Sequence, residues 1–404
     1  MQYIQDILKE CYAPAIINQV YKKAPFWGQI KKTSKGVYGK RLVIPVTTSF
    51  SEAVGARVAN NYTLPTASKS TFDQAYVYVK RNYGRIQVDG LAIEAVKSKG
   101  GWVDIVSTES KNVSSAFALD VDRQSLGRGD AVVGHVVSVS GSDIVVDNPF
   151  GITEASTARL FRAGMILDGY DYVDNTKHID SLTVSSISSN TLTMGASTGI
   201  SSLADGDKLV REDTWSATAA NIGEMMGLDG IIDSGNTPGS DFQGIDATSE
   251  STWQAYEDST AQVISEDVLQ GALDEIEKIT DGDAPNLALT TYALRNKLIS
   301  IIRSDRLIDS MTLVGGWKAI KYVGGNVELP IMVHKNCPTG YFYYISLSHI
   351  KFYTLKSLVW DNKGGGILKP VTDQDAYEAW FKMYGNIGTN CRNAHGKLTG
   401  LTTS

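Results

Sequence analysis

The sequence predicts an α+β protein that carries an inserted small all-β domain, and three patterns lead to this prediction. Apolar residues recur at helical spacing in several segments, most clearly over residues 102–126 and 259–280. Alternation with period two marks long strands within residues 39–88. Short strands divided by turn sequences fill residues 131–212, where no helical periodicity competes. The length of 404 residues allows two or three compact units.

The first elements of the chain do not bury their own apolar surface. Residues 3–21 have the spacing of an amphipathic helix interrupted by Pro14, which we expect to lie against another surface. Two alternating runs, around Ile44 and Tyr76, predict a long hairpin, and the connecting residues 51–70 hold only scattered apolar side chains. Because a two-stranded hairpin cannot form a core, we expect it to find support on a neighbouring molecule.

The remaining elements follow in order along the chain. Residues 102–126 predict a long one-sided helix that ends at Gly127 and Gly129. After the strand-rich insertion, residues 259–280 predict a helix whose buried face includes Val263, Ile264 and Ile279. A buried strand, a further helix and a strand-rich tail are expected over residues 286–290, 291–302 and 317–401.

Charge is distributed unevenly, although the net charge is only −6. The first 41 residues hold eight Lys or Arg against two acids, whereas residues 214–283 hold fifteen acids against a single Lys. Such segments attract each other, and in a repeating assembly the attraction can act between neighbouring copies. The alternative is that both segments form solvated faces.

The sequence contains no motif for catalysis, cofactor binding or metal binding. No nucleophile elbow, phosphate-binding loop or zinc-protease motif occurs, and the five histidines never stand at ligand spacing. The three cysteines form no CxxC pair, and the N-terminal residues do not have the pattern of a secretory signal. We therefore expect no catalytic, cofactor-binding or metal-binding residues, no membrane segment and synthesis in the cytoplasm.

Several segments and their order resemble a known family. Residues 315–325 (GGWKAIKYVGG), followed by LPIMV at 329–333 and Cys337–Pro338, resemble the glycine-marked strands and proline turn of one of its domains. The closing runs AWF at 379–381 and NCRNAHGKL at 390–398 resemble its final strands. With the order of arm, hairpin, helix and mixed domain, the chain resembles the major capsid proteins of tailed bacteriophages, whose shell-subunit fold also forms herpesvirus capsid floors and encapsulin nanocompartments.

The resemblance implies a capsid-protein fold with six parts. They are an N-terminal arm (1–38), an extended hairpin loop (39–88), a peripheral domain with a long spine helix (89–130), the inserted β-barrel or sandwich (131–213), an axial domain (214–367) and return strands of the peripheral domain (368–404).

The resemblance also implies a structural role in a virion, without enzymatic activity. The expected function is self-assembly as pentamers and hexamers into an icosahedral shell around double-stranded DNA, after synthesis in the host bacterial cytoplasm. Implied partners are identical copies, a portal, a possible decoration protein, non-specifically contacted DNA and, since the arm begins at Met1, a separate scaffolding protein. Candidate assembly contacts are Lys22, Lys23, Lys31, Lys32, Arg57, Lys69 and Trp380.

Alternatives remain open at this stage. A nanocompartment shell protein would share the fold, and a virion decoration or binding protein would use the inserted β domain as its ligand site. An enzyme with a carboxylate pair hidden in residues 214–283 is a third possibility. Some relatives crosslink a lysine to an asparagine, and here only residue type would nominate Lys69 with Asn386, Asn390 or Asn393.

Overall fold

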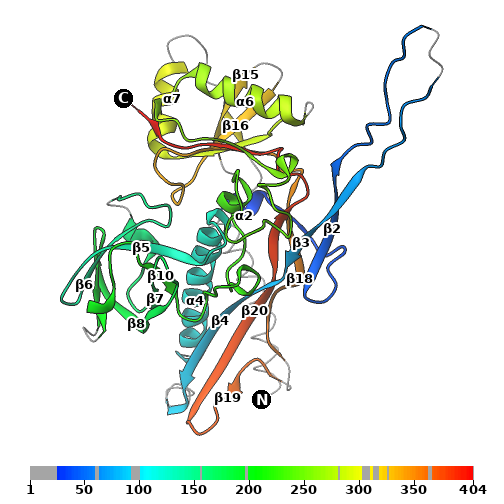
Figure 1. Cartoon of the computed structure of the whole chain (residues 1–404). Coiled ribbons are helices and arrows are strands. Elements are labelled where there is room, and N and C mark those ends of the chain that lie inside the picture. Colours follow the sequence, from blue (N-terminus) through cyan, green and yellow to red (C-terminus); the bar gives the residue numbers. More distant parts are fainter. Residues whose placement is uncertain are drawn as a thin grey trace.

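The computed structural model describes residues 25–59, 63–91, 101–154, 157–195, 199–280, 283–302, 310–312, 318–324, 327–362 and 366–403. The predicted N-terminal helix, residues 3–21, lies outside the described residues. The described chain forms a central sheet with a long helix along it, a barrel on one side, a second α/β unit and a projecting hairpin (Figure 1).

The central sheet is built around the longest strand, β20. Strand β18 pairs with β20 on one side and β4 pairs with it on the other, while β1 and β19 complete the sheet. Consecutive residues of β20 are buried, so both faces of the strand are covered. This explains its position in the middle of the sheet. The bounds are α2 (Pro25–Gln29), β1 (Lys31–Thr33), β4 (Lys80–Asp89), β18 (Ile350–Trp360), β19 (Lys369–Pro370) and β20 (Ala376–Thr389).

The predicted spine helix is confirmed as α4 (Gly101–Leu126), which runs along the central sheet (Figure 1). Phe117 and Val121 of its apolar stripe are buried, and Phe117 packs edge-on against Phe381 of β20 with ring centroids 5.0 Å apart. Gly129 has φ +75°, a left-handed conformation that favours glycine and turns the chain away from the helix axis.

The inserted domain is a closed six-stranded barrel, which confirms the predicted all-β insertion. The barrel order is β10-β5-β6-β9-β8-β7, and alternate side chains fill its interior, among them Val136, Ile144 and Leu167. The bounds are β5 (Val132–Ser140), β6 (Asp143–Asp147), η1 (Thr157–Leu160), β7 (Ile166–Tyr170), β8 (Lys177–Ser188), β9 (Thr191–Met194), η2 (Ile200–Ser202) and β10 (Lys208–Arg211).

The second α/β unit is a seven-stranded sheet with order β11-β21-β17-β13-β16-β15-β14. Its core joins sheet residues such as Ala288 and Ile331 to the apolar faces of α6 and α7, including Leu273 and Leu298. The bounds are β11 (Tyr256–Asp258), α6 (Glu266–Thr280), β13 (Leu287–Thr290), α7 (Tyr292–Ile302), β14 (Ser310–Thr312), β15 (Lys318–Gly324), β16 (Val327–Val333), β17 (Phe342–Ile345) and β21 (Gly396–Leu398).

The helix predicted over residues 259–280 starts later than expected. It begins at Glu266, and β12 (Gln262–Val263) instead pairs in parallel with β22 (Leu401–Thr402). Val263 and Ile279, both expected on the buried face, are 46% and 49% exposed, and Ile264 is buried but precedes the helix. Short turns of helix join this unit to the barrel, namely η3 (Ala219–Asn221), α5 (Leu228–Ile231) and η4 (Ser251–Trp253).

The hairpin consists of β2 (Arg41–Ser49) and β3 (Thr71–Tyr78), which form a two-stranded sheet of their own. The sequence placed the hairpin over residues 39–88, but residues 80–89 are β4 and pair with β20 in the central sheet. The paired part of the hairpin therefore ends at Tyr78. Among the described residues, no helix has both the length and the apolar character needed to span a bilayer.

Candidate assembly interface

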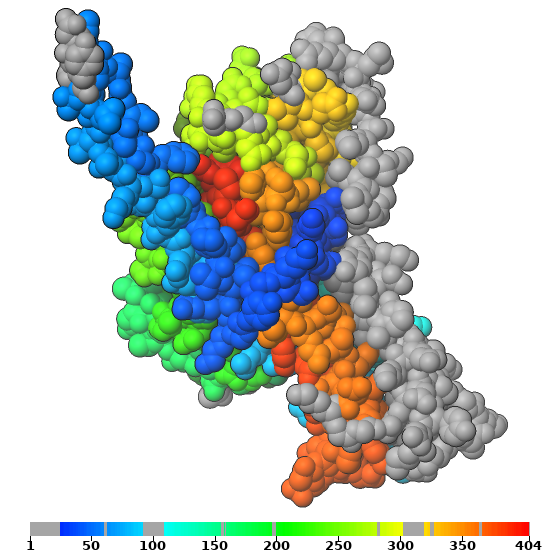
Figure 2. All heavy atoms as spheres, turned by 90° about the vertical axis from the view of Figure 1, so that its right-hand side faces the viewer, coloured from blue at the N-terminus to red at the C-terminus, as the bar shows by residue number. Residues whose placement is uncertain are grey.

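The hairpin projects beyond the rest of the molecule in both views (Figures 1 and 2). Its strands pair in antiparallel register from Arg41↔Tyr78 to Ser49↔Thr71, with one irregularity near the outer end. Beyond Ser49 the two legs are joined by polar contacts, such as Ser51 Oγ to Ser68 Oγ at 2.9 Å. These contacts hold the legs together without forming a core.

Large apolar side chains are exposed on both legs of the hairpin and on its approach. Elsewhere in the described chain most large apolar side chains pack into five clusters, and the exposed ones are scattered over several elements. Exposed apolar surface of this kind is typical of interaction sites. Its burial against a partner removes apolar area from water and stabilises the complex. Seven such residues are 44–84% exposed, namely Tyr38, Val43, Phe50, Val54, Val58, Leu64 and Phe72.

The base of the hairpin is held firmly, in contrast to its outer part. Leu42 and Val77 are buried beside Tyr353 of β18. The backbone N–H of Tyr76 donates to the Gln243 carbonyl at 2.5 Å, which ties β3 to the loop preceding η4. The guanidinium of Arg41 lies 4.1 Å from the centroid of the Tyr76 ring. The direction of the hairpin is thus fixed by the folded body.

Lys80 connects the hairpin to the chain that returns from the barrel. It stands at the start of β4, just after the hairpin, and is only 9% exposed. Its Nζ donates to the carbonyls of Ala220 at 3.0 Å and Ile222 at 2.6 Å, and to that of Ala219 at 3.4 Å. These bonds secure η3 beneath the hairpin base, where a cavity of about 370 Å³ lies between Tyr76, Lys80 and Phe242.

The candidate contacts named from the sequence are dispersed by the fold. Lys22 and Lys23 lie outside the described residues, while Lys31 is exposed on β1. Lys32 lies 5.1 Å from the ring of Trp27, and burial lowers its pKa to about 8. The exposed Arg57 donates to the Thr63 carbonyl at 2.7 Å in the outer hairpin.

The last two candidates are also far apart. Lys69 is exposed on the returning leg of the hairpin. Trp380 is half-buried in β20, where the Lys369 ammonium lies 3.9 Å from its ring centroid. The structure therefore brings Arg57 and Lys69 onto one projection and places Lys31, Lys32 and Trp380 in the central sheet region.

Part of the acidic segment 214–283 is neutralised inside the chain. Asp229 is buried and accepts from Arg128 Nε at 2.8 Å and from Lys397 Nζ at 3.3 Å. Glu224 is buried against Arg123, and the low polarity there raises the pKa of Glu224. The acids of α6 are different, since Asp267, Asp274 and Glu275 are exposed. Among the described residues of the segment, Asp241 and Asp283 are exposed as well, so the solvated face considered above holds for part of the segment.

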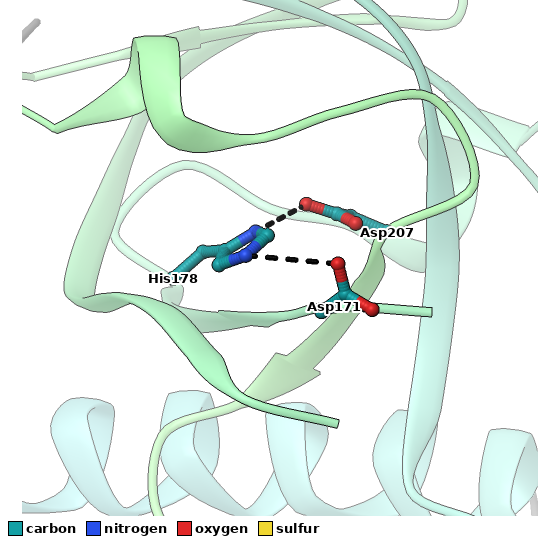
Figure 3. A group of neighbouring side chains, drawn as sticks. All are labelled: Asp171, His178 and Asp207. Atoms are coloured by element: carbon teal, nitrogen blue, oxygen red, sulfur yellow. Dashed lines mark hydrogen bonds and ion pairs between the residues drawn. The ribbon is translucent and has the colours of Figure 1, made fainter. Parts of the chain in front are cut away.

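One cluster has the residue types of a metal site, at the rim of the barrel (Figure 3). Asp171, His178 and Asp207 each offer a ligand atom, and these atoms lie within 4.8 Å of one another. Hydrogen bonding to Asp207 raises the pKa of His178. The sequence predicted no metal-binding residues, because these three lie on separate segments of the chain and show no local spacing.

Comparison with known protein families gives no match, and comparison with curated protein sequences gives none either. The structure, in contrast, is similar to a chain of the cyanophage A-1(L) capsid asymmetric unit, with a TM-score of 0.53 and 11% identity over 94% of this chain and 93% of that chain. This similarity shows a shared fold and confirms the α+β capsid-protein fold expected from the sequence.

Two further structures align over most of the chain with lower scores. The capsid of Myoviridae phage XM1 gives a TM-score of 0.44 and 8% identity over 93% of this chain and 91% of that chain. An encapsulin complex from Synechococcus elongatus gives a TM-score of 0.42 and 8% identity over 93% of this chain and 86% of that chain.

Proposed function

We propose that this protein is the major capsid protein of a tailed bacteriophage, which self-assembles as pentamers and hexamers into an icosahedral shell enclosing double-stranded DNA. The observation that carries the proposal is the hairpin, whose base is fixed to the folded body while its outer part exposes apolar side chains. The fold shared with the cyanophage capsid chain supports the same reading. The role is structural and requires no catalytic residue.

In this proposal the hairpin of one subunit lies over an adjacent subunit and buries Phe50, Val54 and Leu64 there. Each buried apolar side chain of this size contributes roughly 1.5–3 kcal/mol. The gain at a single contact is reduced by the loss of freedom on association. In a closed shell every subunit makes several contacts at once, so weak interfaces become collectively stable.

Charge supports contacts of two further kinds. The N-terminal arm, residues 1–38, is basic and is proposed to reach a neighbouring copy and the packaged DNA, with Lys22, Lys23 and Lys31 as candidate contacts. DNA contact through such residues is non-specific and weakens with salt. The exposed acids of α6 are available to basic residues of other copies.

The partners and parts of the shell follow from the same proposal. In this proposal the central sheet with α4, which includes β4, β18 and β20, forms the peripheral domain. The seven-stranded unit, which includes β21, forms the axial domain and meets its copies around the five-fold and six-fold centres. A scaffolding protein and a portal act during assembly, and a decoration protein is a possible outer partner. The barrel, residues 131–213, is an additional domain attached to these two domains.

Electron cryo-microscopy of particles formed by the full-length chain in a bacterial cytoplasm tests the proposal. We expect closed shells with pentamers and hexamers. A small oligomer of fixed size would contradict this and favour a decoration or binding protein.

A second measurement identifies the contents. Particles assembled in cells that also make the other virion proteins are expected to hold nuclease-protected double-stranded DNA. Shells that contain a copurifying enzyme in place of DNA would show a nanocompartment instead.

A further inference from the structure

We propose that Asp171, His178 and Asp207 form a binding site for a divalent transition-metal cation at one rim of the barrel. The topology brings them together. Strand β7 lies between β8 and β10 in the barrel and pairs with both in antiparallel fashion. Asp171 follows the end of β7, His178 lies at the start of β8 and Asp207 directly precedes β10, so all three occupy the same rim.

The distances around the His178 ring leave room for an ion on one side only. Its Nδ1 lies 2.8 Å from Asp207 Oδ2, which is a hydrogen bond. Its Nε2 lies 3.7 Å from Asp171 Oδ2, which is longer than a hydrogen bond. A zinc-type ion bound at about 2.0–2.2 Å from each atom bridges a gap of this size. Figure 3 shows each carboxylate joined to a different nitrogen of the ring.

Asp207 has the role of the group that orients a metal-binding histidine. Its side chain is only 2% exposed, and Oδ2 also accepts from the backbone N–H of Ala204 at 2.9 Å. The carboxylate is therefore fixed, and it binds Nδ1 so that Nε2 points toward Asp171. Metal-binding histidines regularly pair their second nitrogen with a carboxylate in this way.

Asp171 divides its two oxygens between the loop and the proposed ion. Oδ1 accepts from the backbone N–H groups of Val173 at 2.6 Å and Asp174 at 2.8 Å, which closes a turn. Oδ2 faces His178. Cation binding would therefore join the turn to β8. That turn carries Tyr172 and Val173, which are 60% and 84% exposed and give the barrel an apolar tip.

The donor set indicates the class of cation. One imidazole nitrogen with carboxylate oxygens suits Zn²⁺, Co²⁺ or Mn²⁺, whereas Mg²⁺ and Ca²⁺ prefer oxygen ligands alone. His178 and Asp171 are each 25% exposed, so water has access to complete the coordination shell.

Calorimetric titration of the full-length chain with ZnCl2, with CoCl2 absorption spectra as a second readout, tests the site. We expect one binding event per chain and a visible Co²⁺ spectrum, with at least tenfold weaker binding in Asp171→Asn. That variant keeps the Oδ1 acceptor for the turn. His178→Ala is expected to abolish binding. MgCl2 is expected to give no binding event at the same concentration.

His135→Ala is the matched control, since His135 is also a half-buried barrel histidine next to a carboxylate, with Nδ1 3.5 Å from Asp147. It is expected to bind Zn²⁺ as the unaltered chain does. Absence of Zn²⁺ binding by the unaltered chain, or equal binding in His178→Ala with an unchanged far-ultraviolet circular dichroism spectrum, would show that the cluster is an ion pair only.

Discussion

His334 and Asp122 form a fully buried hydrogen bond, with 2.9 Å between Nε2 and Oδ1. His334 directly follows β16, and Asp122 lies in the spine helix α4. The second oxygen of Asp122 accepts from Asn336 Nδ2 at 3.1 Å, and His334 Nδ1 accepts from the Asn336 backbone N–H at 3.1 Å. The network joins the central helix to the second α/β unit.

Removing one partner of this network should destabilise the subunit strongly. Asp122→Ala leaves the buried His334 donor and the partly buried Asn336 donor without this acceptor, which costs about 3 kcal/mol of unfolding free energy. Urea denaturation of the unassembled subunit measures it. Lys335→Ala is the control, because Lys335 is 42% exposed at 3.7 Å from Asp122 and should change stability little. Equal effects of the two changes would contradict the network's role.

Arg392 should be irreplaceable by lysine. It is fully buried, and its guanidinium donates to the carbonyls of Ile231 at 2.9 Å and Gly235 at 2.8 Å, among others. Burial lowers its pKa to about 10. Arg392→Lys loses the planar fork of donors and is expected to cost about 2–3 kcal/mol in thermal or urea unfolding.

The control for this change is Arg85→Lys. Arg85 pairs with Glu378 at the surface with its side chain 59% exposed. A surface pair of this kind contributes at most about 1 kcal/mol, so the variant should unfold like the original chain. An Arg392→Lys protein as stable as Arg85→Lys would refute the role assigned to the guanidinium.

His395 should make the subunit sensitive to acid. Burial lowers its pKa from 6.5 to about 3, and Nδ1 accepts from the Ser346 backbone N–H at 3.1 Å. Between these two values the unfolded state binds more protons than the folded state, so stability falls as the pH decreases. The loss between pH 7 and pH 4 amounts to roughly 3 kcal/mol.

Comparison of the unaltered chain with His395→Gln isolates this contribution from those of the carboxylates. Urea midpoints at pH 7 and pH 4 are expected to differ less in the variant. The assignment fails if both proteins lose the same stability.

Replacing either of two glycines with alanine should change the stability of the subunit, in opposite directions. A Cβ at Gly84 would lie 2.1 Å from the Phe381 ring, which Phe117 and Trp360 hold by edge contacts at 5.0 Å and 5.2 Å. Gly84→Ala is expected to destabilise by about 2 kcal/mol. Gly271 in α6 has open space around it, so Gly271→Ala should stabilise by up to about 1 kcal/mol. Thermal unfolding measures both effects. A lower melting temperature in both Gly84→Ala and Gly271→Ala would be inconsistent with this packing.

The sequence predicted elements whose signal is local. The barrel strands were found because turn sequences separate short apolar runs, and α4 because Phe117 and Val121 repeat on one stripe. The early start assigned to α6 was wrong for a non-local reason. Residues 262–263 pair with Leu401–Thr402, and no property of the segment itself reveals that partner.

The candidate site was predicted only in part. Alternation and the polar residues 51–70 indicated a hairpin in need of support, but β4 looks the same in sequence and differs only because β20 pairs with it. The burial of Asp229 against Lys397 and the meeting of Asp171, His178 and Asp207 also depend on contacts between distant segments. Charge counts and residue spacing contain no information about such contacts.

The central claim is that the hairpin gains its burial from neighbouring copies, and a triple substitution tests it most directly. In Val54→Ser/Val58→Ser/Leu64→Ser the exposed apolar side chains are removed from the outer hairpin, while Tyr172→Ser/Val173→Ser makes the same kind of change on the barrel. Shell formation is measured by analytical ultracentrifugation and electron microscopy, with circular dichroism to confirm folding. The account predicts that the hairpin variant stays a folded, unassembled subunit while the barrel variant forms shells. Closed shells formed by the hairpin variant as efficiently as by the unaltered chain would contradict it.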